Sequence, residues 1–260
     1  MIYVYTAILD MWDNLRPPLV QHSEDNVRYI CFTNSPIQPG CPPWEFRPCP
    51  DVGVASRSSR VPKILPHLCL PSDADYSIWH DGNFQLQKPA RHIVGELLRF
   101  DDWAAHRHPA RDCVYEEAAV LLSEGIGTPE LVQAQIDRYR AMEYPAHAGL
   151  WANGFIVRRH TALVERLNER WWRLFADGCE RDQLSFPMAR HLESVPLNGG
   201  GINHGIVDDI FHSPYVRFNW HAAWREQQDN PSYWPQREQL RAQTKMLAKV
   251  SGAKLRVMEY

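Results

Sequence analysis

The sequence predicts an α/β fold in which helices flank a mostly parallel central sheet. Two runs of β-branched and aromatic residues, MIYVYTAIL at 1–9 and VRYICFT at 27–33, are typical of buried strands. Strand-like and helix-like segments then alternate along the first hundred residues, which is the pattern of parallel strands joined by helical crossovers. With 44% hydrophobic and 23% charged residues, the 260-residue chain has the composition of a globular protein with a substantial core.

Each further element of the first half has a local reason. A third short strand, WEFRP at 44–48, follows a turn-rich segment. The segment 55–70 predicts short helical pieces, because its two prolines interrupt any single regular helix. DYSIW at 75–79 is the next strand. PARHIVGELLRF at 89–100 is a helix that opens with a proline and repeats apolar residues at helical spacing.

The second half is predicted to be more helical. The segment 128–144 opens with Thr128 as a helix N-cap, followed by a proline. GLWANGFIVRRH at 149–160 reads as a strand or hairpin, and the next fifteen residues, 161–175, carry the apolar stripe of an amphipathic helix. A last helix is expected at 235–249.

Composition argues against several classes of protein. A nucleic-acid-binding protein usually carries an excess of basic residues, and the net charge of -3 and the pI near 6.5 show no such excess. Six cysteines occur without a C-x-x-C pair, so we expect free thiols and not a zinc ribbon or a redox dithiol. No apolar run is as long as a membrane span, and Met1 leads straight into IYVYTAIL without the basic flank of a signal peptide. We therefore expect a cytoplasmic protein.

Three polar or small residues, Asp81, Gly82 and Asn83, lie just past the strand at 75–79, after His80. In open α/β sheets, ligands bind outside the carboxyl ends of the strands, near the point where the strand order reverses. The side-chain oxygens of Asp81 and Asn83, separated by a glycine that lets the backbone turn sharply, suit a hard divalent cation and the diphosphate it carries. The same residues also suit a simple Asp-Gly-Asn turn that ends the strand.

The chain carries five segments whose order is informative: SRVPKILPH, ADYSIWHDGN, HPARDCVYEEA, GLWANGFIVRRHT and RDQLSFP. Between about Ser59 and Pro187 they resemble the motif series of the glycosyltransferase-like domain family found in a plant seed-mucilage protein and a plant turgor-regulation protein. The resemblance implies a GT-A type fold, with a nucleotide-binding sheet and an acceptor-binding half. It predicts a single domain with a nucleotide-binding part at 1–100, an acceptor-side part at 101–225 and a helical tail at 226–260.

Under this resemblance the segment 81–83 is the counterpart of the family's metal and nucleotide-sugar motif. Asn83 departs from the commoner D-x-D pattern, because it offers a neutral carbonyl oxygen where a carboxylate is usual. Mn²⁺ or Mg²⁺ is the expected cofactor, held weakly or not at all. His221 is an expected further ligand, because many metal-dependent GT-A enzymes add a carboxyl-terminal histidine to the cation. His212 and His204 compete for that role.

Other residues acquire expected roles in donor binding. Arg60 and Lys63, one helical turn apart, would hold the donor's diphosphate, the arginine as a planar fork and the lysine as a point charge. A solvated basic face is the equal alternative. Tyr5 and Thr6, near the end of the first strand, lie where such folds usually meet the nucleotide base. Both residues fit the hydrophobic core equally well.

Two carboxylates are the candidate catalytic residues. Asp182, in RDQLSF, is expected nearest the sugar, either as general base on an acceptor hydroxyl or as a hydrogen-bond partner. A helix N-cap is the structural alternative for Asp182. Glu117, next to Glu116 in YEEA, is the second choice for acid or base.

The resemblance thus predicts a glycosyltransferase that moves a sugar from a nucleotide-sugar donor, a UDP-sugar in the first instance, to an acceptor hydroxyl. Two alternatives stay open. A hydrolase is suggested by the ceramidase activity assigned to a plant member of the family, although the sequence has no G-x-S-x-G elbow. A sugar- or nucleotide-binding module without catalysis is suggested by Asn83.

Overall fold

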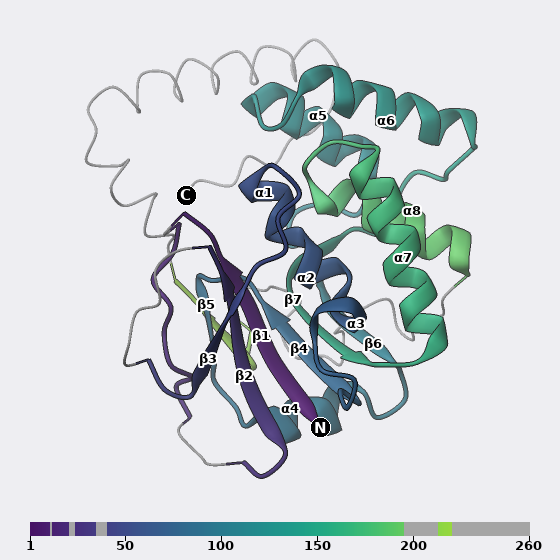
Figure 1. The fold of residues 1–260 in the computed structure, drawn as a ribbon. Coiled ribbons are helices and arrows are strands. Elements are labelled where there is room, and N and C mark those ends of the chain that lie inside the picture. Colours follow the sequence, from purple (N-terminus) through teal and green to yellow (C-terminus); the bar gives the residue numbers. More distant parts are fainter. Residues whose placement is uncertain (11, 21–23, 35–40, 195–212, 220–260) are drawn as a thin grey trace.

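A computed structural model describes residues 1–10, 12–20, 24–34, 41–194 and 213–219 (Figure 1). Its centre is a six-stranded sheet with the order β3-β2-β1-β4-β7-β6. The strands of this sheet are β1 (Ile2–Ile8), β2 (Val27–Thr33), β3 (Trp44–Pro48), β4 (Tyr76–His80), β6 (Trp103–Arg107) and β7 (Trp151–Arg159). β1 to β4 are parallel, whereas β7 is antiparallel to β4 and β6. The predicted α/β fold with a mostly parallel sheet is confirmed.

The remaining strands and the helices surround this sheet. β5 (Phe84–Leu86) and β8 (Val216–Phe218) form a separate antiparallel pair. The described helices are α1 (Ala55–Ser58), α2 (Arg60–Ile64), α3 (Pro66–Cys69), α4 (Ala90–Leu97), α5 (Val114–Glu124), α6 (Pro129–Ala141), α7 (Ala162–Ala176) and α8 (Asp182–Glu193). None of these helices combines the length and the apolar character that a membrane crossing requires.

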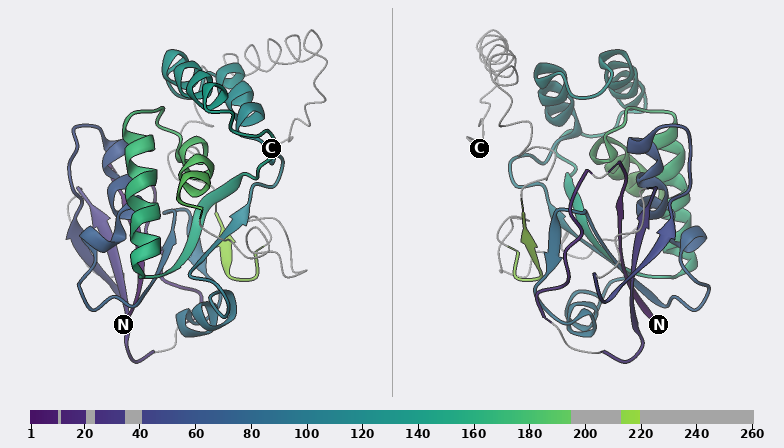
Figure 2. Two further views of the ribbon diagram at one scale, coloured as in Figure 1. Left: turned by 90° about the vertical axis from the view of Figure 1, so that its right-hand side faces the viewer. Right: turned by 60° about the vertical axis from the view of Figure 1, so that its left-hand side comes forward.

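The sheet separates two hydrophobic layers, because successive side chains of a strand point to opposite faces. On one face, Ile2 and Val4 of β1 belong to a buried cluster that includes α4. On the other face, Tyr3 and Tyr5 pack with residues of α2, α7 and α8. Figure 2 shows α7 along one side of the sheet and α4 on the other. A third cluster joins α5, α6 and α8.

Most local predictions for the described residues are confirmed. The segment with two prolines forms three short helices, α1 to α3, and 149–160 contains the single strand β7. The helix predicted at 89–100 ends at Leu97, and its first N–H groups, those of Ala90 and Arg91, donate to the carboxylate of Glu24 at 2.8 and 3.0 Å. All six cysteines are free thiols, as expected. The predicted helix and tail beyond residue 225 lie outside the described residues.

The order of the strands creates a crevice at one edge of the sheet. From β1 the chain adds β2 and then β3 on one side, and it next crosses to place β4 on the other side of β1. The connections that leave the carboxyl ends of β1 and β4 therefore diverge, which opens a space between them. In Figure 1 this edge is the upper end of the sheet, next to α1.

Candidate active site

A pocket of about 550 Å³ lies at this divergence. Its walls come from the segment that follows β1, from α1 and α2, from the end of β4 and from the start of α8. Four residues predicted from the sequence line it: Arg60, Lys63, Asp81 and Asp182. The fold thus brings together charged side chains that are far apart in the sequence, at the place where open α/β sheets bind ligands.

Lys63 is the centre of the charge network in this pocket. Its ammonium nitrogen lies 2.6 Å from Oδ2 of Asp182 and 3.3 Å from Oδ1 of Asp81. The same nitrogen lies 5.7 Å from the ring centre of Trp79. Only 2% of the Lys63 side chain is exposed, so the two carboxylates compensate a charge that is almost completely removed from bulk water.

Asp81 presents one fixed oxygen and one available oxygen. The indole N–H of Trp79 donates to Oδ1 at 2.9 Å, beside the contact with Lys63. Oδ2 has no hydrogen-bond partner among the described residues, and 32% of the side chain is exposed. Burial raises the pKa of Asp81, but the positive charges of Lys63 and Arg60 outweigh this effect and hold the pKa below its usual value. Asp81 is therefore a carboxylate at neutral pH.

Asp182 is the first residue of α8, and its side chain is buried against the same lysine. Its Oδ1 lies 3.9 Å from Nε of Arg60. Burial raises the pKa of Asp182, but Lys63 and Arg60 lower it by more, to about 2. A general base works best with a pKa near the working pH, so Asp182 is suited to hold a cation and accept hydrogen bonds, and unsuited to remove a proton. The N-cap residue of α8 is Arg181, so the structure does not place Asp182 at the N-cap that the structural alternative assigned to it.

Two arginines add positive charge to the same wall. Arg60 donates from Nη1 to Oγ of Ser59 at 2.9 Å, and 26% of its side chain is exposed. Arg181 lines the pocket directly before α8, and its Nε is buried without a hydrogen-bond partner among the described residues. Guanidinium groups match the geometry of phosphate oxygens. This wall is therefore built to receive an anion.

The part of the lining that follows β1 has a different character. It is formed by Asp10, Trp12 and Asp13. Trp12 is 46% exposed, which leaves part of its flat apolar face open to a ring of a ligand. The pocket thus has a basic wall from α2 and α8 and an acidic and aromatic wall from the segment after β1.

Arg158 of β7 supports Lys63 from inside the core. It is fully buried, and its Nη1 donates to the carbonyl oxygen of Lys63 and to the hydroxyl of Tyr5, each at 2.8 Å. Its guanidinium carbon lies 4.2 Å from the ring centre of Trp103. Burial lowers the pKa of Arg158 to about 10, so it still carries its charge at neutral pH. The backbone of α2 is therefore tied to the sheet at the residue that holds the charge network.

Gly82 lets the segment after β4 approach the segment after β1. A Cβ at this position would lie 2.8 Å from Cγ1 of Ile8 and 3.2 Å from Cβ of Asp13. The first distance is shorter than side chains tolerate, so the glycine is required by contact and not only by a turn.

Several other predicted residues do not line the pocket. Tyr5 and Thr6 are fully buried, in agreement with the alternative that placed them in the core. Tyr5 packs edge-on against Trp79, with ring centres 5.3 Å apart. Glu117 is 3% exposed and accepts a hydrogen bond from Nε of Arg111 at 2.7 Å. Its carboxylate therefore holds the start of α5 to the preceding loop.

The predicted metal ligands are not brought together in the described structure. Asn83 is 3% exposed, and its Oδ1 is buried without a partner, but the residue is not part of the pocket wall. His221, with its competitors His212 and His204, lies outside the described residues. Asp81 already shares an oxygen with an ammonium group. The described part of this donor set does not fit a firmly held divalent cation, which needs several oxygen ligands at one point.

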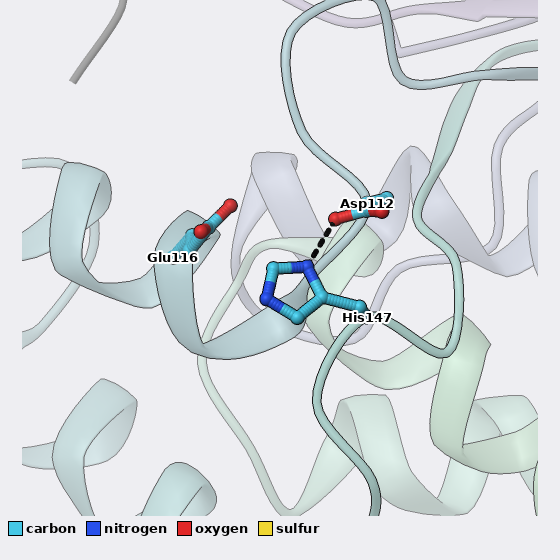
Figure 3. Close-up of side chains that lie close together, drawn as sticks. All are labelled: Asp112, Glu116 and His147. Carbon is cyan, nitrogen blue, oxygen red and sulfur yellow. Dashed lines mark hydrogen bonds and ion pairs between the residues drawn. The ribbon is translucent and has the colours of Figure 1, made fainter. Parts of the chain in front are cut away.

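Within the described ranges, one set of three potential metal ligands lies elsewhere, on the surface (Figure 3). Asp112, Glu116 and His147 are all exposed, and Nδ1 of His147 lies 2.6 Å from Oδ1 of Asp112. The hydrogen bond to Asp112 raises the pKa of His147. Hydrogen bonding and charge within the set account for this arrangement without a metal, and we assign it no role.

Some residues of the site were not singled out from the sequence. One of them is Trp79. It lies two positions before the predicted Asp81, which is the spacing of neighbours on one side of a strand. Arg158 is a charged residue directly after the apolar run FIV, which is unusual in a strand buried on both faces. Both residues could therefore have been found from local sequence patterns. No comparable sequence pattern marks Trp12.

Comparison with known proteins gives one family and a set of distantly similar structures, among them two glycosyltransferases. The model of the TOD1/MUCI70, glycosyltransferase-like domain matches residues 53–197, more than half of the chain. Mouse xyloside xylosyltransferase 1, in its apo form, is 12% identical with a TM-score of 0.43, over 74% of this chain and 81% of that protein. The apo WbbM bifunctional glycosyltransferase is 12% identical with a TM-score of 0.44, over 72% of this chain and 36% of that protein. The comparison with curated proteins found no match. The chain belongs to the TOD1/MUCI70 glycosyltransferase-like domain family.

Proposed function

We propose that this protein is a glycosyltransferase that moves a sugar from a nucleotide-sugar donor, a UDP-sugar in the first instance, to an acceptor hydroxyl. The observation that carries the proposal is the convergence of Arg60, Lys63 and Arg181 in one pocket at the carboxyl ends of β1 and β4. Membership of a glycosyltransferase-like family supports the reaction class. The UDP donor and a cytoplasmic location remain predictions from the sequence.

The charges of the pocket suit the departure of a nucleoside diphosphate. In the transfer, the bond between the anomeric carbon and the diphosphate oxygen breaks, and the diphosphate leaves with the electron pair. Arg60, Lys63 and Arg181 would stabilise the charge that grows on this leaving group. A bond forms between the acceptor oxygen and the anomeric carbon, and the acceptor hydroxyl loses its proton. No step in this scheme requires the divalent cation predicted from the sequence.

Two parts of the pocket would orient the rest of the donor. Oδ2 of Asp81 is an acceptor for a sugar or ribose hydroxyl, because it is ionised and has no partner among the described residues. The exposed part of the Trp12 ring is suited to stack on a base or a sugar. Asp182 would act through Lys63, which it holds in place at 2.6 Å.

Binding of nucleotides tests the proposal directly. We expect UDP or a UDP-sugar to raise the melting temperature of the protein, because a ligand that binds only the folded state stabilises it. Arg60→Ala should weaken this binding by about tenfold or more, because it removes a charged partner of the diphosphate. Arg173→Ala, on the exposed surface of α7, is the matched control and should bind like the wild type. If no nucleotide stabilises the fold, the proposal is wrong.

A binding module without turnover is the second candidate. The low pKa of Asp182 favours it, because this removes the carboxylate predicted as general base. Tight UDP binding without transfer to any acceptor would support this candidate. The predicted hydrolase gains no support from the pocket, whose two central carboxylates both have lowered pKa values and are weak bases. Ceramide hydrolysis without a nucleotide sugar is the result that would favour it.

A further inference from the structure

We propose that the ammonium group of Lys63 is a built-in cation that takes the place of a divalent metal ion in this pocket, so that a nucleoside diphosphate binds without metal. The inference rests on the proposed donor pocket and names what neutralises the diphosphate there. The charge in question is the ammonium of Lys63, and the two carboxylates beside it are those of Asp81 and Asp182.

Lys63 occupies the place between two carboxylates where a metal ion would be expected. A metal ion bound between Asp81 and Asp182 would contact oxygens of both side chains. The nitrogen of Lys63 already lies between them, at 3.3 Å from one and 2.6 Å from the other. A divalent ion at the same point would have to displace a cation of like charge.

The described pocket offers few other oxygen ligands for a metal ion. Among the described residues, the pocket carboxylates do not form a set of three whose ligand atoms lie within 4.8 Å of one another. Asn83, the second oxygen of the D-x-N motif, is not part of the pocket wall. Divalent metals with oxygen ligands need six or more ligands, several from the protein or from phosphate.

Lys63 is held in place before any ligand binds. Its carbonyl oxygen accepts a hydrogen bond from the buried Arg158, and its side chain is 2% exposed. The ammonium donates to Oδ1 of Asp81, and Oδ2 of Asp182 lies 2.6 Å away as an ion pair without hydrogen-bond geometry. Since an ammonium has three N–H donors, at least one remains for a phosphate oxygen. A charge that is already oriented costs little reorganisation when the leaving group develops its own charge.

The test compares UDP binding with EDTA and with Mn²⁺, by calorimetry and thermal shift. All proteins carry Glu116→Gln and His147→Gln, which remove the surface set as a source of Mn²⁺ binding. With Lys63 intact, we expect equal affinity for UDP in EDTA and in Mn²⁺. Lys63→Met should lose about tenfold or more of the affinity in EDTA, because a charged partner is missing. Lys88→Met, outside the pocket, is the matched control and should leave the affinity unchanged.

A second readout does not depend on nucleotide. Lys63→Met leaves Asp81 and Asp182 facing each other without their shared cation, so this variant should bind Mn²⁺, measured by paramagnetic resonance of the free ion. The protein with Lys63 intact should not bind Mn²⁺. Addition of Mn²⁺ should restore UDP binding to Lys63→Met. Lys63→Arg keeps the charge and serves if Lys63→Met does not fold. It should keep metal-free binding.

The outcomes separate this inference from the proposed function. If EDTA abolishes UDP binding to the protein with Lys63, or Mn²⁺ raises it about tenfold, the built-in cation is refuted while the donor site stands. If Mn²⁺ binds equally with and without Lys63, the inference also fails. If no nucleotide binds under any condition but Lys63→Met gains Mn²⁺, the cation is correctly placed and the proposed donor is wrong.

Discussion

Because Gly82 has no side chain, the segment after β4 can approach the segment after β1 closely. Gly82→Ala would place a methyl group 2.8 Å from Ile8 and 3.2 Å from the Cβ of Asp13. We expect a loss of about 1–3 kcal/mol in the free energy of unfolding, which is typical of an overpacked site. Since Asp13 lines the pocket, UDP binding should weaken as well.

Urea unfolding of Gly82→Ala and of a second glycine variant measures this effect. In Gly95→Ala the new Cβ meets no atom within 4 Å, and Gly95 lies in α4. That control should be neutral or stabilised by up to about 1 kcal/mol, because alanine favours a helix over glycine. Equal stability of Gly82→Ala and the wild type would contradict the close contact.

Among the helices and strands, local residue spacing predicted most elements of the first half of the chain. It did not predict the contacts that hold these elements in place. The two prolines predicted an interrupted helix, and Pro66 begins α3, whereas Pro62 lies inside α2 and the break between α1 and α2 contains no proline. β6 was not predicted, because WAAHR is short and weak in β-branched residues and becomes a strand by pairing with β7. The cap of α4 was also invisible, because Glu24 lies 66 residues before Ala90.

Glu24 gives a test at this scale. Its carboxylate accepts from the N–H groups of Ala90 and Arg91, at the positive end of the α4 dipole. We expect Glu24→Ala to lower the free energy of unfolding by about 1 kcal/mol, the usual value of a helix cap. Glu130→Ala, in the first turn of α6, is the control and should cost less, because no hydrogen bond of its side chain to a helix N–H is present. A larger effect of Glu130→Ala in thermal unfolding would contradict the cap.

At the scale of the whole molecule, topology explains which predicted site residues meet. Arg60, Lys63, Asp81 and Asp182 meet because three connections open at the same edge of the sheet. Tyr5 and Thr6 belong to β1 itself, and the pocket begins only at Ala7. A sequence pattern indicates the presence of a strand more clearly than the point where its buried part ends. The predicted contacts with the nucleotide base were therefore assigned to two residues that come before the pocket along the strand. The bond from Arg158 to Lys63 joins β7 to α2 over 95 positions, which no local pattern indicates.

The pairing of Lys63 with Asp182 joins α2 to α8, so it should set part of the acid stability of the whole fold. The pKa of Asp182 is about 2 in the folded protein, below its ordinary 3.8. A carboxylate with a lowered pKa stabilises the folded state above its ordinary pKa, and this stabilisation disappears as the pH falls toward the folded value. We expect the wild type to lose about 2 kcal/mol on this account between pH 4 and pH 2.

Asp182→Asn should be less stable at pH 7, because the buried Lys63 then keeps only Asp81 as a carboxylate partner, and it should lose less on acidification. Urea unfolding at several pH values measures both slopes, with Glu169→Gln on the exposed surface of α7 expected to follow the wild type. Equal acid slopes for the wild type and Asp182→Asn would show that Asp182 titrates as an ordinary carboxylate, and that the charge network around Lys63 does not form.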